Sequence, residues 1–443
     1  MKKFYLAYAG LYLVSASDSI RYSMGWATWI LLIIGLGLTA IIWFLRSKPL
    51  QTLKLVPPAL WLLLGWMILS LLWSSYQSAS LIGLLEVFFG TGFALFLVAS
   101  FDWKQLLKLL ANTMRFILVI SIAFELFAAT VIRAPIYPLF RDFQNLDSHA
   151  QAYYWTRSGL FKGERIQGIV GNANLLAYLA MLGLILFLVQ YAIGQTHRAV
   201  SVCSISLAAL CLLLARSAGV TLALSIVALA FIVLVLAEGK DQTSRHRFYR
   251  VAYTIAGIGL FFIAIYSQEF FLLIGKTPDM TGRTDLWLLV ISLISQKPWL
   301  GWGWIGYWQP GVKPYDGLFV REGVTYYQAH DIFLDFWVQI GAIGLALLLV
   351  VIVLTFIKLW RLAVRHRDPL YSWPLMIFLS LLGHNILESR MIIEIGWVLF
   401  ILLAVKINDA NAVSQAEPKI GKREALKILL ARLIGRGWEK TSY

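Results

Sequence analysis

Hydrophobic runs of roughly 20 residues repeat along most of the chain, separated by short breaks that contain basic residues, glycine or proline. A helix of about 20 apolar residues crosses the hydrocarbon core of a bilayer, so each run predicts a transmembrane helix. A transmembrane barrel would show short alternating segments instead. The pattern predicts an all-α polytopic membrane protein of about twelve transmembrane helices. The runs lie near residues 4–17, 25–45, 56–75, 79–100, 105–132, 173–193, 198–215, 217–237, 250–275, 331–357, 371–388 and 391–407.

Basic residues gather in every second break, which predicts the orientation of the chain because Lys and Arg stay on the cytoplasmic side. Both termini are then cytoplasmic. The two long breaks, about 133–172 and 276–330, become external loops, a placement typical of binding or catalytic segments. Residues 1–407 form the predicted transmembrane domain, and residues 408–443 form a basic cytoplasmic tail. The tail either lies against anionic lipid or docks on a partner, and its charge favours the lipid.

Composition agrees with a membrane protein. The chain is 60% hydrophobic and 14% charged, whereas soluble proteins carry about 25% charged residues. The net charge of +15 reflects helix orientation, so we expect membrane lipids as partners and no nucleic acid. Cys203 and Cys211 lie in one apolar run, which indicates packing and no disulfide framework.

Polar chemistry concentrates between residues 281 and 344. Arg283 lies in a turn before a predicted helix from Asp285 to Ile294, and Asp285 in its first turn suits the helix dipole. Two interpretations of this segment stay open. Arg283 of an interfacial helix pairs with lipid phosphate, or it binds the phosphate of a substrate.

The loop 298–308 is dense in glycine and aromatic residues, among them Trp302 and Trp304. Glycine lets the backbone approach a ligand closely, and aromatic faces suit sugar surfaces. Trp and Tyr also collect at the lipid–water boundary. The pattern favours the boundary interpretation.

His330 precedes an apolar run on the external side, and histidine can act as a general base near neutral pH. A single histidine there is also compatible with a polar boundary residue. Asp331 follows it and could orient the ring or cap the helix.

Two further arginines, Arg165 and Arg216, lie near the predicted outer face. An arginine close to hydrocarbon is costly unless it is paired or reaches the headgroups. Together with Arg283 they would form a diphosphate site, because guanidinium groups bind phosphate oxygens in bidentate fashion and keep their charge.

His384 and Glu388 are four residues apart near the outer end of the run 371–388. If both lie on one helix face, the two side chains either pair with each other in a structural role or hold the residues of the site in position. The spacing favours the structural pair. The sequence contains no paired-cysteine, HExxH or EF-hand pattern, so we predict no metal.

Five segments carry motifs that occur in a fixed order: 163–183, 214–224 (LARSAGVTLAL), 281–287 (TGRTDLW), 297–304 (KPWLGWGW) and 329–345 (AHDIFLDFWVQIGAIGL). Together they resemble the O-antigen ligase and O-antigen polymerase superfamily, and most closely its exopolysaccharide branch. This resemblance implies an external-face glycosyltransferase of the inner membrane without a cofactor, whose donor is an undecaprenyl-diphosphate-linked glycan. The acceptor is a glycan or a lipid. The family's essential histidine falls on His330, and its donor-binding arginines fall on Arg165, Arg216 and Arg283. Many members have His-Asn where this chain has His330-Asp331.

The resemblance implies inverting, metal-independent transfer in which His330 takes the proton of the acceptor hydroxyl. Ligase and polymerase are hard to separate by sequence, and we prefer the ligase. A transferase of the dolichyl-phosphate-mannose-dependent kind usually carries an acidic pair in the first external loop, where this chain has only Asp18. A transporter or flippase would place ionisable groups near the bilayer midplane, whereas here they lie mainly at one face.

Overall fold

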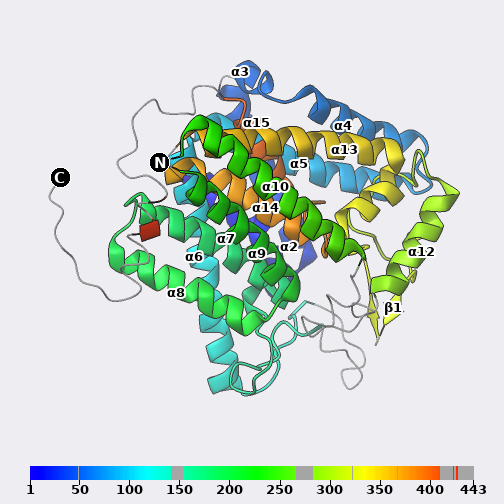
Figure 1. Ribbon diagram of the computed structural model, residues 1–443. Coiled ribbons are helices and arrows are strands. Elements are labelled where there is room, and N and C mark those ends of the chain that lie inside the picture. The colour runs from blue at the N-terminus through cyan, green and yellow to red at the C-terminus, as the bar shows by residue number, and fades with distance from the viewer. Residues whose placement is uncertain are drawn as a thin grey trace.

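The computed structural model describes residues 1–47, 49–140, 153–238, 240–265, 283–321, 323–366, 368–409, 423, 426 and 427. These residues form a helical bundle (Figure 1). Its helices are α1 (Lys2–Ser15), α2 (Ser17–Arg46), α3 (Pro49–Leu53), α4 (Pro58–Leu69), α5 (Gln77–Ser100), α6 (Trp103–Phe127), α7 (Ala173–Ala192), α8 (Arg198–Ala215), α9 (Ala218–Ala237), α10 (Gln242–Ile265), α12 (Arg283–Gln296), α13 (Ile332–Arg365), α14 (Trp373–Asn385) and α15 (Glu394–Lys406). Short helical turns are η1 (Ser70–Leu72), η2 (Ala128–Ile132), η5 (Gly168–Val170) and η6 (Pro369–Tyr371). A small hairpin pairs β1 (Val320–Arg321) with β2 (Val324–Thr325) in antiparallel fashion.

Each predicted apolar run overlaps a helix, and the chain is a multi-pass membrane protein. Within the described residues, seven helices are long and apolar enough to cross a membrane: α2, α5, α6 with η2, α7, α8, α9 and α13. Helices α14 and α15 have 13 residues each, about 20 Å at 1.5 Å per residue, against a hydrocarbon core of about 30 Å. The total of about twelve spans therefore stays a prediction.

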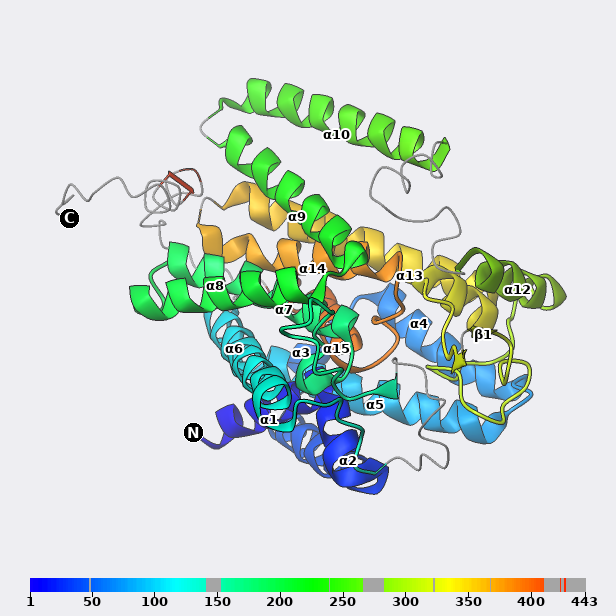
Figure 2. The same cartoon turned by 90° about the horizontal axis from the view of Figure 1, so that it is seen from below.

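Helices α7 and α15 lie in the interior of the bundle. In α15 every residue from Ile395 to Lys406 is buried, and 78% of the apolar window of α7 is buried, against 22% in α2. A helix that is apolar on all sides is buried either by other helices or by lipid, and other helices surround α7 and α15. Helix α10, by contrast, lies at the outside of the bundle beside α9 (Figure 2).

Helix α13 is kinked where it meets the aromatic loop 298–308. The backbone is non-helical at Ile340 and Gly341, which frees carbonyl groups that helix bonds would otherwise use. The carbonyls of Val338 and Gln339 accept hydrogen bonds from the N–H groups of Trp302 and Gly303, at 3.0 and 2.8 Å. The glycines of this loop therefore permit close contact with α13.

Glu125 of α6 fixes the loop that follows α6 to the bundle. Its fully buried carboxylate accepts the N–H groups of Gln167 and Gly168, at 2.8 and 2.7 Å, and the hydroxyl of Thr156 at 2.8 Å. A buried carboxylate is stable when donors satisfy its oxygens. The segment that carries Arg165 is thus held rigidly against α6.

Several predictions fall wholly or partly on residues that the structure does not describe. They are the turn residues Thr281 and Gly282, the end of the apolar run 250–275, parts of the long loops 133–172 and 276–330, and most of the basic tail 408–443. The division into a membrane domain and a tail therefore stays a prediction. The predicted helix from Asp285 to Ile294 is confirmed, because α12 contains it. The prediction that Arg283 lies in a turn before this helix is wrong, because α12 begins at Arg283.

Candidate functional site

His330 lies at the start of α13, where the chain turns sharply into the helix. Its φ is +54°, in the left-handed region that non-glycine residues seldom adopt. The next residue, Asp331, caps α13 by accepting the N–H groups of Phe333 and Leu334, both at 2.9 Å. The His330 side chain keeps 18% of its surface exposed. The turn thus presents the imidazole at the surface of the bundle with one side open.

Glu388 joins His330 to the arginines. It lies in the loop between α14 and α15, and its side chain is 5% exposed. Its Oε2 is 3.0 Å from His330 Nδ1. Its Oε1 is 3.3 Å from Arg283 Nη2 and accepts the amide of Asn174 at 3.0 Å. One carboxylate therefore connects α7, α12 and the start of α13.

Arg165 belongs to the same network through Asn174. Its Nη2 donates to Asn174 Oδ1 at 2.5 Å, and its Nε donates to the carbonyl of Ala215 at 2.7 Å. Arg216 follows Ala215 as the left-handed C-cap of α8, and its exposed side chain donates to the carbonyl of Gly163 at 2.9 Å. Arg165 therefore lies beside the end of α8, where Arg216 is the C-cap, and is linked to Arg283 through Asn174 and Glu388.

Burial and charge act in opposite directions on Glu388. Burial alone would raise the pKa of its carboxyl, but His330, Arg283 and Arg390 hold that pKa well below its usual range. Glu388 is therefore ionised at neutral pH. An ionised Glu388 accepts a hydrogen bond from the N–H at His330 Nδ1, which leaves the lone pair of Nε2 available.

Two other groups are shifted by burial. Burial raises the pKa of the Asp331 carboxyl to about 6, although the N–H groups of Leu334 and Phe333 and the charge of Arg283 oppose the change. Burial, and then the nearby charge of Arg157, lowers the pKa of Arg165. Positive charge is therefore concentrated at Arg165, a condition that favours an anionic ligand.

The aromatic candidates take structural positions. Trp304 is fully buried and packs edge-on against Phe336 at 5.1 Å between ring centres. Trp302 is partly exposed, donates to the carbonyl of Leu293 at 3.1 Å and lies under the Lys297 ammonium, 4.1 Å from the ring centre. Asp285 is exposed in the first turn of α12, where its charge suits the helix dipole. Of the two tryptophans, Trp302 alone has surface that a sugar could touch.

The predicted pairing of His384 with Glu388 on one helix face is wrong. Helix α14 ends at Asn385, whose side-chain oxygen accepts the N–H of Met391 at 2.8 Å and so folds the following segment back. His384 stacks on Tyr178 at 4.5 Å, and within the described residues its ring nitrogens have no hydrogen-bond partner. Glu388 instead contacts His330, Arg283 and Asn174.

Sequence reasoning missed three polar residues of this region. Asn174 bridges Arg165 to Glu388. Gln328 donates to Glu388 Oε2 at 3.3 Å and accepts the N–H of Ser389 at 3.2 Å. Arg390 is partly buried, and its charge acts on both Glu388 and Glu394. Each of the three lies in or beside a motif or polar patch that already contained a candidate. Nearness in the sequence to Arg165, His330 or Glu388 was therefore the signal that could have identified them.

Among the residues that the structure describes, no three His, Cys, Asp or Glu side chains are grouped as metal ligands. The positive groups near the histidine are arginines. They offer donors for phosphate oxygens without a metal ion.

Comparisons with known proteins bear on the segment that carries most of these residues. Residues 203–349 match the family described as O-antigen ligase. The exopolysaccharide production protein ExoQ of Rhizobium meliloti (strain 1021) is 30% identical over 138 residues, which cover 30% of this chain and 28% of that protein's length. The predicted resemblance to the O-antigen ligase superfamily is confirmed. Arg216, Arg283 and His330 lie inside the matched family segment, whereas Arg165 and Glu388 lie outside it.

Proposed function

We propose that this protein is a membrane glycosyltransferase of the O-antigen ligase type. It moves a glycan from an undecaprenyl diphosphate carrier to the hydroxyl of a glycan or lipid acceptor, on the external face of the inner membrane. The observation that carries the proposal is the position of Glu388, which touches both His330 and Arg283. A base and a phosphate-binding group thus meet in one place, inside a chain whose central segment matches the O-antigen ligase family.

In the proposed reaction His330 Nε2 takes the proton of the acceptor hydroxyl. The hydroxyl oxygen forms a bond to the anomeric carbon while the bond from that carbon to the diphosphate oxygen breaks. Attack from the face opposite the diphosphate inverts the anomeric configuration. Glu388 holds the other ring nitrogen and stabilises the imidazolium that forms.

Arg165, Arg216 and Arg283 bind the departing diphosphate. Their charges offset the negative charge that grows on its oxygens, a task that a divalent metal performs in other transferases. Arg165 and Arg283 already share hydrogen bonds with the Asn174–Glu388 pair. This arrangement fixes their guanidinium groups before the donor arrives, which lowers the cost of binding.

The products of the purified protein test this function. The protein is incubated with a cell's own lipid-linked glycans in buffer that contains EDTA, and the products are analysed by mass spectrometry. We expect glycan transfer with release of the undecaprenyl diphosphate. Absence of any transfer, or transfer that EDTA abolishes and Mg²⁺ restores, would contradict the proposal.

The same assay separates the ligase from its alternative, a polymerase of lipid-linked repeat units. One glycan joined to a foreign acceptor identifies a ligase, and a ladder of lipid-linked oligomers identifies a polymerase. The similarity of residues in this chain to an exopolysaccharide production protein keeps the polymerase as the second candidate. Translocation of lipid-linked glycan by a protein without transferase activity would favour the flippase alternative.

A further inference from the structure

Asp335 is a fully buried carboxylate in the first turn of α13. Its Oδ2 atom accepts the N–H of Ala329 at 2.9 Å and the hydroxyl of Ser389. Ala329 directly precedes His330, and Ser389 directly follows Glu388. One oxygen atom therefore links the two chain segments that carry the proposed base and its carboxylate partner.

The backbone of Ala329 is also linked to α12. The indole N–H of Trp287 donates to the carbonyl of Ala329 at 2.9 Å, and Trp287 lies one helical turn after Arg283 in α12. Both backbone groups of the residue before His330 thus have partners, one on α13 and one on α12. Asp335 and Trp287 together place the proposed base relative to the helix that carries Arg283.

The turn at His330 depends on such contacts. Its φ of +54° lies in the left-handed region, which is strained for a residue with a Cβ atom and persists only where surrounding contacts fix the backbone. On the C-terminal side of the turn, Asp331 supplies this support as the cap of α13. On the N-terminal side, Asp335 supplies it through Ala329. Without the Asp335 contact, the backbone at His330 can relax and move the imidazole.

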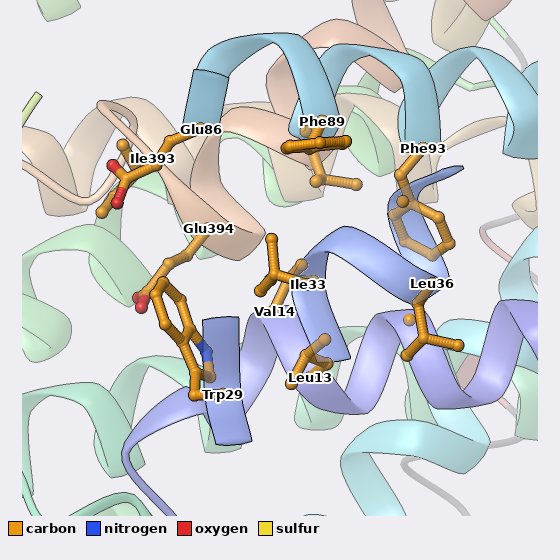
Figure 3. A pocket seen from close by; sticks show the side chains of 14 residues that line it. Leu13, Val14, Trp29, Ile33, Leu36, Glu86, Phe89, Phe93, Ile393 and Glu394 are labelled. Carbon is orange, nitrogen blue, oxygen red and sulfur yellow. The ribbon is translucent and has the colours of Figure 1, made fainter. Parts of the chain in front are cut away.

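The loop between α14 and α15, in which Ser389 lies, is anchored separately at its far end. Glu394, the first residue of α15, accepts a hydrogen bond from Arg21 at 3.0 Å. Glu394 lies at the edge of a largely apolar cavity of about 50 Å³ that Trp29 also lines (Figure 3). Because these contacts already fix the end of the loop, the bond from Ser389 to Asp335 determines where the middle of the loop lies relative to α13.

Asp335 can act on a reaction only through its neighbours. Because its side chain has no exposed surface, it cannot touch an acceptor or a diphosphate. Within the described residues its other oxygen, Oδ1, has no hydrogen-bond partner, so Oδ2 alone makes both links. The links therefore require one acceptor oxygen at this place, which an asparagine also supplies.

We propose that Asp335 is a positioning residue that keeps His330 and Glu388 in contact by linking Ala329 to Ser389. The distance that this link controls is the 3.0 Å between His330 Nδ1 and Glu388 Oε2. The effect of Asp335 on glycan transfer rests on the proposed function. The link itself does not, because it can be measured in a protein that transfers nothing.

The first experiment compares Asp335→Ala with Asp335→Asn in transfer assays of the full-length protein. Alanine removes the acceptor oxygen. Because a displacement of about 1 Å in an active site costs about 100-fold, kcat of Asp335→Ala should fall about 30-fold or more, with the KM values for donor and acceptor within about twofold of wild type. Asp335→Asn should keep kcat within about threefold of wild type, because its oxygen accepts the same hydrogen bonds.

Ser389→Ala removes the other end of the link and leaves Asp335 in place. It should lower kcat about fivefold, the effect of one lost hydrogen bond. Its combination with Asp335→Ala should lower kcat no further than Asp335→Ala alone, because both changes break the same link. Ser380→Ala is the matched control and should keep the wild-type kcat, because Ser380 is also fully buried but donates to the carbonyl of Ile377 in its own helix.

Hydrogen exchange measures the link without glycan transfer. The N–H of Ala329 is bonded to a buried oxygen, so it exchanges only when the link opens. With the protein in nanodiscs, the peptide that contains Ala329 should exchange about tenfold faster in Asp335→Ala than in wild type, and at the wild-type rate in Asp335→Asn and Ser380→Ala.

Wild-type kcat in a folded Asp335→Ala, or equal losses in Asp335→Ala and Asp335→Asn, would overturn the positioning role while leaving the transferase intact. Additive losses in the double variant would also overturn it, because Asp335 and Ser389 would then act separately. If Asp335→Ala does not fold, the comparison of Ser389→Ala with Ser380→Ala decides, and equal kcat values would overturn the role. Faster exchange at Ala329 in Asp335→Ala, in a protein that transfers no glycan, would support the link and contradict the proposed function.

Discussion

Glu388 is the residue on which the geometry of the proposed site depends most. It is 5% exposed and lies within hydrogen-bond reach of His330 and Asn174, with Arg283 at ion-pair distance. A carboxylate in such a place is stable because its partners are positive or donate protons, so the same groups that lower its pKa also hold it in position. Loss of its charge would release His330 and Arg283 together.

Glu388→Gln should lower kcat about 100-fold, because a neutral amide stabilises the imidazolium of His330 less than a carboxylate does. The acidic limb of the pH–rate profile should also move to lower pH, which a purely structural defect would not cause. Steady-state transfer kinetics from pH 5 to 9 measure both effects. Asp316→Asn, a change of an exposed carboxyl in the later loop, is the control and should keep the wild-type profile. A kcat within twofold of wild type would remove Glu388 from the account.

Asp331 gives a prediction about pH and stability. Its pKa of about 6 in the folded protein exceeds the value of about 3.9 in an unfolded chain. The folded protein therefore binds this proton more tightly than the unfolded chain does. The resulting contribution to the free energy of unfolding is fully present below about pH 4 and is lost as the pH rises through about 6. Asparagine caps a helix as well as aspartate does and cannot ionise.

Asp331→Asn should therefore unfold at a higher temperature than wild type at pH 7.5, and at the same temperature at pH 4. Thermal unfolding of the detergent-solubilised proteins at both pH values measures the difference. An equal gain at the two pH values would show that ionisation of Asp331 does not matter to stability.

Among the elements, α13 and the aromatic loop show what sequence can and cannot reveal. The glycines of the loop predicted that its backbone could approach a ligand closely. In the structure the loop backbone does make a close approach, but its partner is α13. The kink at Gly341 had no sequence signal beyond a glycine within an apolar run. Which surface a loop meets depends on tertiary packing, so local patterns could not distinguish a sugar cleft from a helix contact.

Gly341→Ala should disrupt this contact. With φ of +69°, a Cβ at this position would lie 2.0 Å from the carbonyl oxygen of Trp299 and 2.5 Å from the N atom of Leu300. The clash and the strained backbone should cost about 3 kcal/mol or more. Thermal unfolding measures the loss, and transfer activity should fall with it.

Gly65→Ala is the matched control, because its Cβ would meet nothing within 4 Å in α4. Alanine in a helix is favoured over glycine by about 1 kcal/mol, so this variant should be as stable as wild type or more stable. Equal stability of both variants would mean that the loop does not pack on the kink.

In the whole molecule, hydrophobic periodicity predicted the helices well and the polar contacts poorly. Runs of apolar residues report membrane helices directly, and the described helices follow them. Arg165, Arg283 and His330 were candidates because their chemistry is explicit, and the structure links them. Glu388 was assigned to a helical pair with His384 because the pattern could not show that α14 ends at Asn385. Long-range partners such as Asn174 and Glu388 depend on how α7 and α14 pack, which no local pattern encodes.

The predicted orientation can be tested across the whole chain. In a background of Cys203→Ser and Cys211→Ala, single cysteines are introduced at Lys162 and Lys54, both exposed in the structure. A membrane-impermeant maleimide should label the cysteine at 162 in intact cells, or in cells with a permeabilised outer membrane if there is one. The cysteine at 54 should react only after the inner membrane is opened. The reverse pattern would invert the topology and place the proposed site in the cytoplasm.

The most direct test of the account is the rate of glycan transfer by His330→Ala with donor and acceptor both saturating. A general base contributes about 10²–10⁴-fold, so we predict that kcat falls by at least about 100-fold while the protein still binds its donor. His197→Ala, which changes an exposed histidine before α8, should keep the wild-type rate. Full transfer by His330→Ala would contradict the account, because the site would then work without the group around which Glu388 and the arginines are arranged.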